Sequence, residues 1–285
     1  MKCFGLFIHH KLRDSQSVFE LLDHLRKSYG YTFVGDSEQE SLLPEFVKCF
    51  DWSSGKVSGI DAILVFGGDG TILRAKKLAL ATGAPLLGIN LGYLGFLSET
   101  TLAEIQSSLE TLVKGKYKLL TRMLLDAKVQ RGKDRAYQGL ALNDAVIYKA
   151  ATPRLINVRL FNNKRYVFDA RCDGFIASTP TGSTAYSLAA GGPILDPEMN
   201  ALILSPINPH LLSVRPMVFQ AQDKLMMRVY NMDEPACLQI DGVNSLYLEE
   251  QDEIHVTASS QTVSFIKLSQ RSFYRILRTK LHLGK

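Results

Sequence analysis

The sequence of 285 residues lacks several features that mark particular protein classes. Its four cysteines, Cys3, Cys49, Cys172 and Cys237, lie far apart and form no Cys-x-x-Cys pair, which argues against a zinc cluster or a redox motif and favours a reducing compartment. The first apolar run, CFGLFI, has only six residues, which is too short for the core of a signal peptide, and no run reaches the roughly 18 apolar residues of a membrane helix. We therefore expect a cytoplasmic protein.

Charge of one sign is not in large excess either. The sequence contains 33 Lys and Arg and 28 Asp and Glu, which gives a formal net charge of +5. This suits an anionic ligand but falls short of the concentrated basic patch of a nucleic-acid-binding protein. With 46% hydrophobic and 21% charged residues, the composition is that of an ordinary globular protein, and the length favours two domains. We expect neither nucleic acid nor a membrane as a partner.

Up to about residue 116, short apolar runs alternate with helical spacing. The runs at 3–8, 62–66 and 85–89 are typical of buried strands. Segments 17–30 and 101–115 have apolar residues at helical spacing and end at glycine. This alternation predicts an α/β domain with a mainly parallel, Rossmann-like sheet. We expect the polar segment 36–59 to be a long loop.

From residue 117 the sequence changes to many short strand-like runs separated by turn residues. Such a pattern predicts an all-β, sandwich-like domain. Helical spacing returns at the end, through Phe273, Ile276 and Leu277, and the basic residues there indicate the solvated face of a docking helix or, as the alternative, a nucleic-acid arm. The predicted domains are 1–116, 117–268 and a terminal helix in 269–285.

An acid lies among three glycines where the run 62–66 ends. The segment AILVFGGDGT contains Gly67, Gly68, Asp69, Gly70 and Thr71. Glycines allow a backbone to approach a ligand closely, and α/β sheets bind ligands beyond their strand ends. The segment matches neither the Walker A pattern nor G-x-G-x-x-G. The acid has three candidate roles, namely to hold a divalent metal, to accept a proton from a hydroxyl or to bind a ribose; alternatively it caps a tight turn.

A second polar motif lies at 169–195, DARCDGFIASTPTGSTAYSLAAGGPIL. Six hydroxyl residues fall within the ten positions 178–187, next to Tyr186. Their density favours a binding surface with many donors over an ordinary turn. Arg171 and Asp173 are two positions apart and would share one face of a strand. Asn143 and Asp144 at the end of a strand can read a base and a ribose, or mark a bulge. We expect His9, His10 and His210 to be structural.

Taken together, the segments GGDGT, LNDAV, DGFIASTPTGSTAYSLAAGGPI, SPINPHLLSVRP and RSFYRILRTKL resemble the NAD kinase family, over residues 4–281. The resemblance implies phosphorylation of the 2′-hydroxyl of the adenosine ribose of NAD, with ATP as phosphoryl donor and a divalent metal ion such as Mg²⁺. It also implies an N-terminal α/β domain, a C-terminal β domain that binds NAD and a last helix that returns to the first domain. Members form homo-oligomers, dimers or tetramers, in which the NAD pocket is shared between subunits.

The resemblance assigns roles to individual residues. Asp69 is similar to the proton acceptor, and Gly67, Gly68, Gly70 and Thr71 to the ATP and phosphate loop. The implied NAD contacts are Asp69, Gly70, Arg74, Phe96, Asn143, Asp144, Arg154, Arg171, Asp173, Thr184, Ala185, Tyr186, Ser187, Leu188 and Ala189.

Three positions depart from the family pattern. Asp144 stands where Glu is usual, Cys172 where Gly is usual and Val243 where a polar residue is common. The departures at Asp144 and Val243 keep a non-catalytic dinucleotide-binding regulator as an alternative. Because GGDGT also resembles the loop of diacylglycerol-type lipid kinases, such an enzyme is the second alternative. The metal ligands are not assigned.

Overall fold

The chain forms two compact units. The computed structural model describes residues 2–12, 15–52, 57–92, 94–150, 154–232 and 235–282. The first unit consists of Met1–Thr121 together with Val263–Lys285, and the second of Arg122–Thr262. The boundaries at 116/117 and 268/269 that the sequence suggests for the domains remain a prediction.

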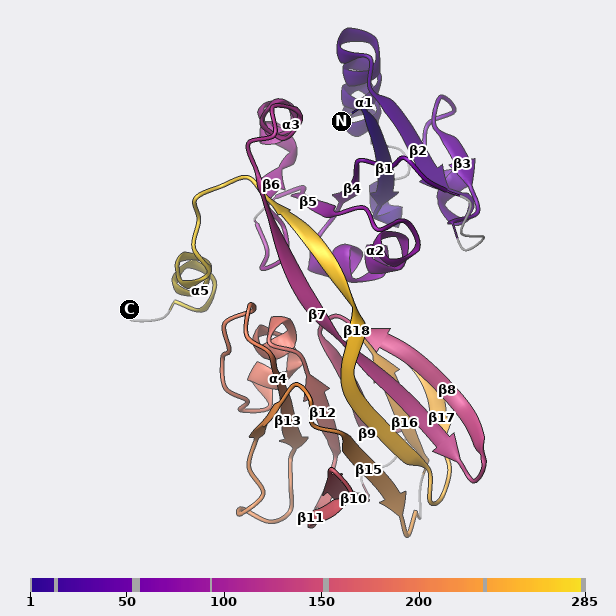
Figure 1. Ribbon diagram of the computed structural model, residues 1–285, viewed down its shortest axis with the longest axis vertical. Helices are drawn as coiled ribbons and strands as arrows, with labels where there is room; N and C mark the ends of the chain where they lie inside the picture. Colours follow the sequence, from indigo (N-terminus) through magenta and orange to yellow (C-terminus); the bar gives the residue numbers. More distant parts are fainter. Residues whose placement is uncertain are drawn as a thin grey trace. The chain divides into compact units, whose positions relative to one another are not determined.

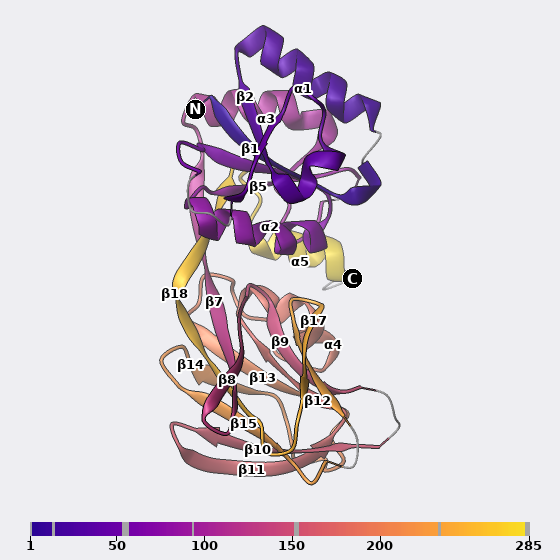
Figure 2. The ribbon, with the colours of Figure 1, turned by 90° about the vertical axis from the view of Figure 1, so that its right-hand side faces the viewer.

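The first unit is built on a parallel sheet in the strand order β3-β2-β1-β4-β5 (Figures 1 and 2). The strands are β1 Cys3–Ile8, β2 Thr32–Asp36, β3 Lys48–Phe50, β4 Ala62–Phe66 and β5 Leu86–Asn90. The short β6, Thr100–Thr101, and the last part of β18, Glu253–Lys267, both pair with β5. All of β4 is buried, as expected for a continuous apolar run in a parallel sheet.

The helices of this unit are α1 Gln16–Tyr29, α2 Asp69–Thr82 and α3 Ile105–Val113. One-turn 3₁₀ helices, η1 His10–Leu12 and η4 Leu102–Glu104, precede α1 and α3. Helix α1 buries Val18, Leu22 and Leu25, which recur at helical spacing, and it ends at Gly30, whose φ of 65° is left-handed. The α/β fold predicted for this part of the chain is therefore confirmed.

The expected long loop at 36–59 is wrong for residues 36–42 and 48–50, and its residues 53–56 lie outside the described part of the chain. A 3₁₀ helix, η2 Ser37–Leu42, and strand β3 occupy this segment. The carboxylate of Asp36 accepts the amide N–H of Glu38 at 3.0 Å, which caps η2, and the indole of Trp52 donates to the Gly35 carbonyl at 2.7 Å. The local cap at Asp36 and the longer-range bond from Trp52 order a segment whose own composition shows no regular spacing.

The second unit contains two antiparallel layers. One layer has the order β11-β10-β15-β18, with β7 next to β18 and β8 next to β7, and the other has the order β14-β13-β12-β9-β16-β17. The strands are β7 Lys118–Arg131, β8 Asp134–Ala141, β9 Asp144–Lys149, β10 Ile156–Asn162, β11 Arg165–Cys172, β12 Gly174–Ser178, β13 Ala201–Ile207, β14 Met217–Gln220, β15 Leu225–Tyr230, β16 Ala236–Ile240 and β17 Val243–Leu248. The 3₁₀ helix η5, Thr181–Thr184, and the short α4, Tyr186–Ala189, follow β12.

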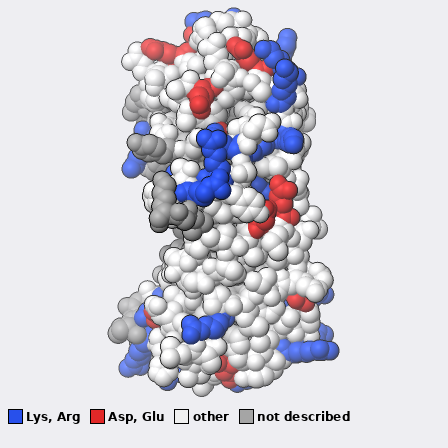
Figure 3. All heavy atoms as spheres, turned by 90° about the vertical axis from the view of Figure 1, so that its left-hand side faces the viewer, with Lys and Arg blue, Asp and Glu red and all other residues white. Residues whose placement is uncertain are grey.

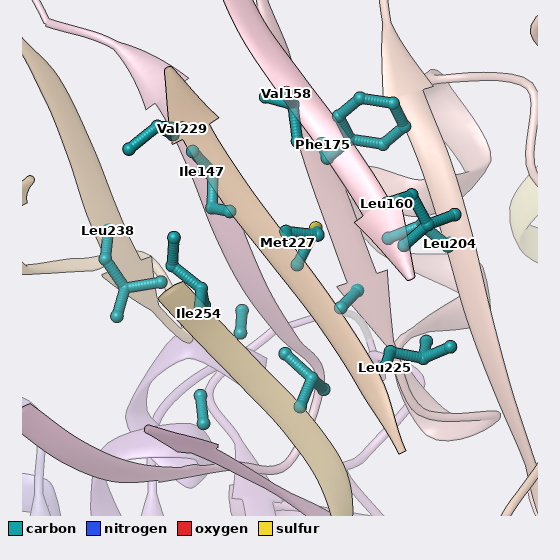
Figure 4. Packing of buried hydrophobic residues seen from close by; sticks show 14 of the residues in the cluster. Ile147, Val158, Leu160, Phe175, Leu204, Leu225, Met227, Val229, Leu238 and Ile254 are labelled. Atoms are coloured by element: carbon teal, nitrogen blue, oxygen red, sulfur yellow. The ribbon is translucent and has the colours of Figure 1, made fainter. Parts of the chain in front are cut away.

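Side chains from both layers meet in one core (Figure 4). Ile147 and Phe175 come from the layer of β9 and β12, and Leu160 and Met227 come from the layer of β10 and β15. In β15, buried positions alternate with half-buried ones, as expected for a strand with one face on the core. The predicted all-β sandwich is confirmed.

The chain ends in helix α5, Phe273–Leu281, which belongs to the first unit as the sequence predicts. Glu99 anchors the segment before it: its carboxylate accepts the N–H of Leu268 at 3.0 Å, and its carbonyl accepts from Arg271 at 2.9 Å. On the face drawn in Figure 3, Lys and Arg lie on both units, with Asp and Glu scattered among them. None of the described helices is long and apolar enough to cross a membrane.

Candidate active site

The glycine loop joins the end of β4 to the start of α2. Gly67 has a φ of 153°, and a Cβ there would lie 2.7 Å from the Cβ of Thr71, so only glycine fits. Gly68 and Gly70 are exposed, and a Cβ on either would meet nothing within 4 Å. The backbone amides at the start of α2 therefore border open space, and such amides attract anions.

Asp69 is the first residue of α2 and is half-buried. Its Oδ2 accepts the amide N–H of Phe96 at 2.8 Å, and its Oδ1 accepts that of Leu97 at 3.1 Å. The sequence offered capping of the next amides as the alternative role, but α2 has no side-chain cap. The carboxylate is instead held by a loop 27 and 28 residues further along the chain. Each oxygen has a second lone pair with which to accept a proton.

Gly95 makes room for this carboxylate. A Cβ on Gly95 would lie 2.5 Å from Cγ of Asp69 and would overlap Oδ1. The Gly95 amide donates to Oγ of Ser98 at 2.6 Å, and the amide of Glu99 donates to the Gly88 carbonyl at 2.9 Å. The sequence reasoning did not single out Gly95. The G-Y-L-G-F-L pattern alone gives no sign that its second glycine contacts Asp69.

Phe96 and Arg74 are the two remaining residues of this unit that were predicted to contact NAD. Phe96 contacts Asp69 directly, and Arg74 lies further along α2. Phe96 is half-buried, and its backbone amide is one of the two that hold Asp69. Arg74 is exposed on α2 and acts electrostatically on His9 at the end of β1. The first unit thus gathers the glycine loop, Asp69 and Phe96 at the ends of β4 and β5.

In the second unit, Asn143 and Asp144 lie where β9 begins. The carboxylate of Asp241 holds this turn: its Oδ1 accepts the amides of Asn143 at 2.8 Å and Asp144 at 3.2 Å, and its Oδ2 accepts that of Leu142 at 2.9 Å. The amide of Thr179 donates to the Asn143 carbonyl at 2.9 Å. The side chain of Asp144 is buried.

Asp241 is the residue that sequence reasoning missed here. It begins the turn between β16 and β17, where Asp241 has a φ of 47° and Gly242 a φ of 80°. An Asp-Gly pair between two strand-like runs is a strong hairpin signal. That signal locates the turn, but it does not reveal that the Asp carboxylate binds another strand.

We expect Asp241→Asn to lower the melting temperature by roughly 5 °C, because hydrogen bonds to charged groups contribute about 1.5–3 kcal/mol and an amide nitrogen cannot accept the N–H groups that one oxygen accepts now. Thermal unfolding followed by circular dichroism measures this. Asp134→Asn, at the exposed start of β8, is the matched control and should melt with the unsubstituted protein. If both variants melted at the same temperature, the carboxylate of Asp241 would not stabilise the turn at Asn143.

The hydroxyl-rich segment 178–187 turns most of its hydroxyls inward. Thr179 donates to the Leu142 carbonyl at 2.6 Å, Ser183 to the Pro180 carbonyl at 2.7 Å, and the hydroxyls of Ser187 and Ser205 lie 2.9 Å apart. The side chains of Ser178, Thr179, Ser183 and Ser187 are fully buried. The predicted surface with many hydroxyl donors is therefore largely an internal network that shapes η5 and α4.

The accessible part of this segment is smaller. Tyr186 and Ala189 are exposed, while Thr184, Ala185 and Leu188 are half-buried. A Cβ on Gly182 would lie 2.6 Å from the carbonyl carbon of Asn143, so η5 packs directly on the turn that Asp241 holds. The structure thus brings Asn143, Asp144 and the predicted residues 184–189 into one region of the second unit.

Arg171 and Asp173 do not share a strand face, because β11 ends at Cys172 and β12 begins at Gly174. Asp173 lies between the two strands, where Nζ of Lys149 is 2.7 Å from Oδ1 and Nδ2 of Asn208 donates to Oδ2 at 2.9 Å. Burial raises the pKa of the Asp173 carboxyl, but Lys149 and Asn208 outweigh this and leave the pKa below its usual value.

Of the other positions discussed in the sequence analysis, Arg171, Arg154 and Val243 are exposed and Cys172 is buried. Arg171 is exposed near the end of β11, and Arg154 is exposed just before β10. Val243 is exposed at the start of β17. Cys172 is fully buried, and burial raises the pKa of its thiol to about 12, so it acts as a packing residue and not as a nucleophile.

Two family models match the chain. The ATP-NAD kinase N-terminal domain matches residues 51–117, and the ATP-NAD kinase C-terminal domain matches residues 142–268. The NAD kinase of Desulforamulus reducens is 41% identical over 221 residues, which cover 78% of this chain and 77% of that protein. The NAD kinase of Carboxydothermus hydrogenoformans is 42% identical over 226 residues, which cover 79% and 81%.

Solved structures share the fold. A yeast NADH kinase complexed with NADH has a TM-score of 0.90 at 24% identity, over 100% of this chain and 89% of that chain. An NAD kinase from Archaeoglobus fulgidus in complex with ATP has a TM-score of 0.72 at 23% identity, over 99% of both chains. With its two family matches and relatives at about 40% identity over most of its length, the chain belongs to the NAD kinase family of enzymes.

Proposed function

We propose that the protein transfers the γ-phosphoryl group of ATP to the 2′-hydroxyl of the adenosine ribose of NAD, with Asp69 as general base. The observation that carries the role of Asp69 is the pair of amides, Phe96 N–H at 2.8 Å and Leu97 N–H at 3.1 Å, that fixes its carboxylate beside an open glycine loop. A positioned carboxylate with unused lone pairs is suited to accept a hydroxyl proton.

The base matters because a sugar hydroxyl is a poor nucleophile while it keeps its proton. In the proposed step the 2′-oxygen attacks the γ-phosphorus, its proton passes to the carboxylate of Asp69, and the bond from the γ-phosphorus to the bridging oxygen of ADP breaks. Phosphoryl transfer depends mainly on alignment and on stabilisation of charge. We therefore expect direct in-line transfer without a phosphorylated enzyme intermediate.

A divalent metal ion, Mg²⁺ in the proposal, neutralises the phosphate charge when it is bound. Among the described residues, no three His, Cys, Asp or Glu side chains form a group that holds a metal ion by themselves. We therefore propose that most ligands of the ion are phosphate oxygens of the substrate, as is usual for Mg²⁺. In the proposal the glycine loop lies beside these phosphates, and Asp69 is the carboxylate of that loop.

For NAD we propose as contacts Asp69, Gly70, Arg74, Phe96, Asn143, Asp144, Arg154, Arg171, Asp173 and residues 184–189. Support comes from the accessible Thr184, Ala185 and Tyr186 and from the braced turn at Asn143. For Ser187 the proposal concerns its backbone, because its side chain is buried. A cytoplasmic homo-oligomer with a shared NAD pocket completes the proposal.

The test is to incubate the purified protein with NAD, ATP and MgCl₂ and to measure NADP with an NADP-specific dehydrogenase. We expect NADP to form in step with ADP, and the absence of NADP would overturn the proposal. A parallel reaction with γ-labelled ATP, quenched during turnover, tests the direct transfer. Label retained covalently on the protein would contradict it.

A further inference from the structure

One edge of β5 brings the end of β18 next to the loop that holds the proposed base. Strand β4 pairs with one edge of β5, and both β18 and β6 pair with the other (Figure 1). Phe265 of β18 lies opposite Leu86, and Thr100 of β6 lies opposite Ile89. Residues 95–99, called here the carboxylate-holding loop, come directly before β6. This loop and the chain that follows β18 therefore lie side by side.

The carboxylate-holding loop rests directly on β5. The amide of Glu99 donates to the Gly88 carbonyl at 2.9 Å. A Cβ on Gly88 would lie 3.0 Å from the carbonyl oxygen of Leu97 and 3.0 Å from Cα of Ser98. The backbones of the loop and of the strand are thus in close contact at Gly88, which leaves no room for a larger residue there.

Glu99 fastens this loop to the chain after β18. Its side chain is only 10% exposed, and Oε2 lies 3.3 Å from Nζ of Lys267. Oε1 accepts the amide N–H groups of Leu268, at 3.0 Å, and of Ser269. The carbonyl of Glu99 accepts from Nη2 of Arg271 at 2.9 Å. A carboxylate so far removed from water is stable only with such donors, so the two segments are bound to each other at this point.

The chain from Glu99 to the amides that hold Asp69 is short. Leu97 is two residues and Phe96 three residues before Glu99, a span of at most about 11 Å even in a fully extended chain. A displacement of Glu99 therefore reaches both amides. Because they donate to the carboxylate of Asp69 at 2.8 Å and 3.1 Å, the carboxylate must move with them.

We propose that Glu99 is a positioning residue for the reaction. With the chain after β18 as its support, it keeps the amides of Phe96 and Leu97 in place and thereby orients the carboxylate of Asp69. The inference rests on the proposed function, in which that carboxylate is the base and Glu99 touches neither substrate. Loss of Glu99 should therefore lower kcat and leave the KM values for NAD and ATP nearly unchanged.

The first test compares Glu99→Ala with Glu99→Gln. Alanine removes the acceptor, and because a misplacement of about 1 Å can cost about 10²-fold, we expect kcat to fall at least about tenfold, with both KM values within about twofold. The single amide oxygen of Gln can replace Oε1 and accept both N–H groups, so Glu99→Gln should recover kcat to within about threefold. If Glu99→Gln were as slow as Glu99→Ala, the acceptor oxygen would not position the loop, and the inference would be overturned.

Glu250→Ala is the matched control. The carboxylate of Glu250 also accepts two consecutive backbone amides, from Asn231 at 2.8 Å and Met232 at 2.7 Å, but in the second unit. It should keep kcat within about twofold, since it loses the same kind of bond away from the loop. Rates are compared at a temperature at which circular dichroism shows every variant to be folded. An equal loss of kcat in Glu250→Ala and Glu99→Ala would overturn the inference.

Hydrogen exchange followed by mass spectrometry reports on the loop without turnover. The amides of Phe96 and Leu97 should exchange at least about tenfold faster in Glu99→Ala and at an unchanged rate in Glu250→Ala. Unchanged exchange in Glu99→Ala would overturn the inference even if kcat fell, because the rate would then not be lost through this loop. If the unsubstituted protein formed no NADP while exchange rose in Glu99→Ala alone, the proposed function would fail and the positioning of the loop would stand.

Arg271→Met is the second variant, should Glu99→Ala not fold. It keeps the carboxylate of Glu99 and removes the donor to its carbonyl. We expect faster exchange at Phe96 and Leu97 and a kcat at least about threefold lower, because one of the bonds that hold the loop is lost. A folded Arg271→Met variant with normal exchange and normal kcat would overturn the inference.

Discussion

Asp69→Asn is expected to lower kcat for NADP formation by about 10²- to 10⁴-fold, the usual range for the loss of a general base. The amide oxygen of Asn can still accept one of the two backbone N–H groups, from Phe96 or Leu97, but its nitrogen cannot accept the other. The loop therefore keeps part of its anchor while the base is lost. Initial rates at saturating NAD and ATP measure the effect.

Asp61→Asn is the matched control for Asp69→Asn. The carboxylate of Asp61 also accepts two backbone amides, from Lys2 at 2.6 Å and Cys3 at 3.0 Å, but it precedes β4, at the end of the strand opposite the glycine loop. Both variants replace a carboxylate that accepts two backbone amides with a neutral amide, and only one of them removes the proposed base. If the two lowered kcat equally, or if Asp69→Asn kept full activity, Asp69 would be an anchor of its loop and not the base.

Sequence alone predicted the strands that carry the glycine loop. The runs that form β1 and β4 are short, apolar and followed by turn residues, so local composition and periodicity suffice to identify them. The same holds for the glycines around Asp69, since a loop after a buried parallel strand is a common ligand site. Strand β2 and the 3₁₀ helix η2 were not predicted, because Gln39 and Trp52 order that region through distant partners.

The geometry of the candidate site was beyond the reach of local patterns. The role of Asp69 depends on amides 27 and 28 residues away, and the turn at Asn143 depends on Asp241, 98 residues away. For the hydroxyls at 178–187, by contrast, the sequence suggested ligand contacts where the structure shows mainly internal hydrogen bonds. Their density correctly marked an unusual segment, but a hydroxyl can serve a ligand or the backbone, and here Thr179 and Ser183 bond to backbone carbonyls.

Gly95→Ala tests the geometry of Asp69 without removing its charge. The added methyl group would lie 2.5 Å from Cγ of Asp69, a separation that non-bonded carbon atoms do not tolerate, so the carboxylate or the loop must move. Because a displacement of about 1 Å at a reacting group can cost about 10²-fold in rate, we expect kcat to fall by roughly that factor. The same kinetic assay measures it, alongside thermal unfolding to show that the variant is folded.

Gly92→Ala is the control from the same loop, because a Cβ on Gly92 would meet nothing within 4 Å. It should keep nearly full activity, since it adds the same methyl group without touching Asp69. A folded Gly95→Ala variant with normal kcat would mean that the carboxylate can move without loss, which is incompatible with a base fixed by the amides of Phe96 and Leu97. Loss of activity in Gly95→Ala but not in Gly92→Ala would instead tie the rate to the position of one carboxylate, independently of its charge.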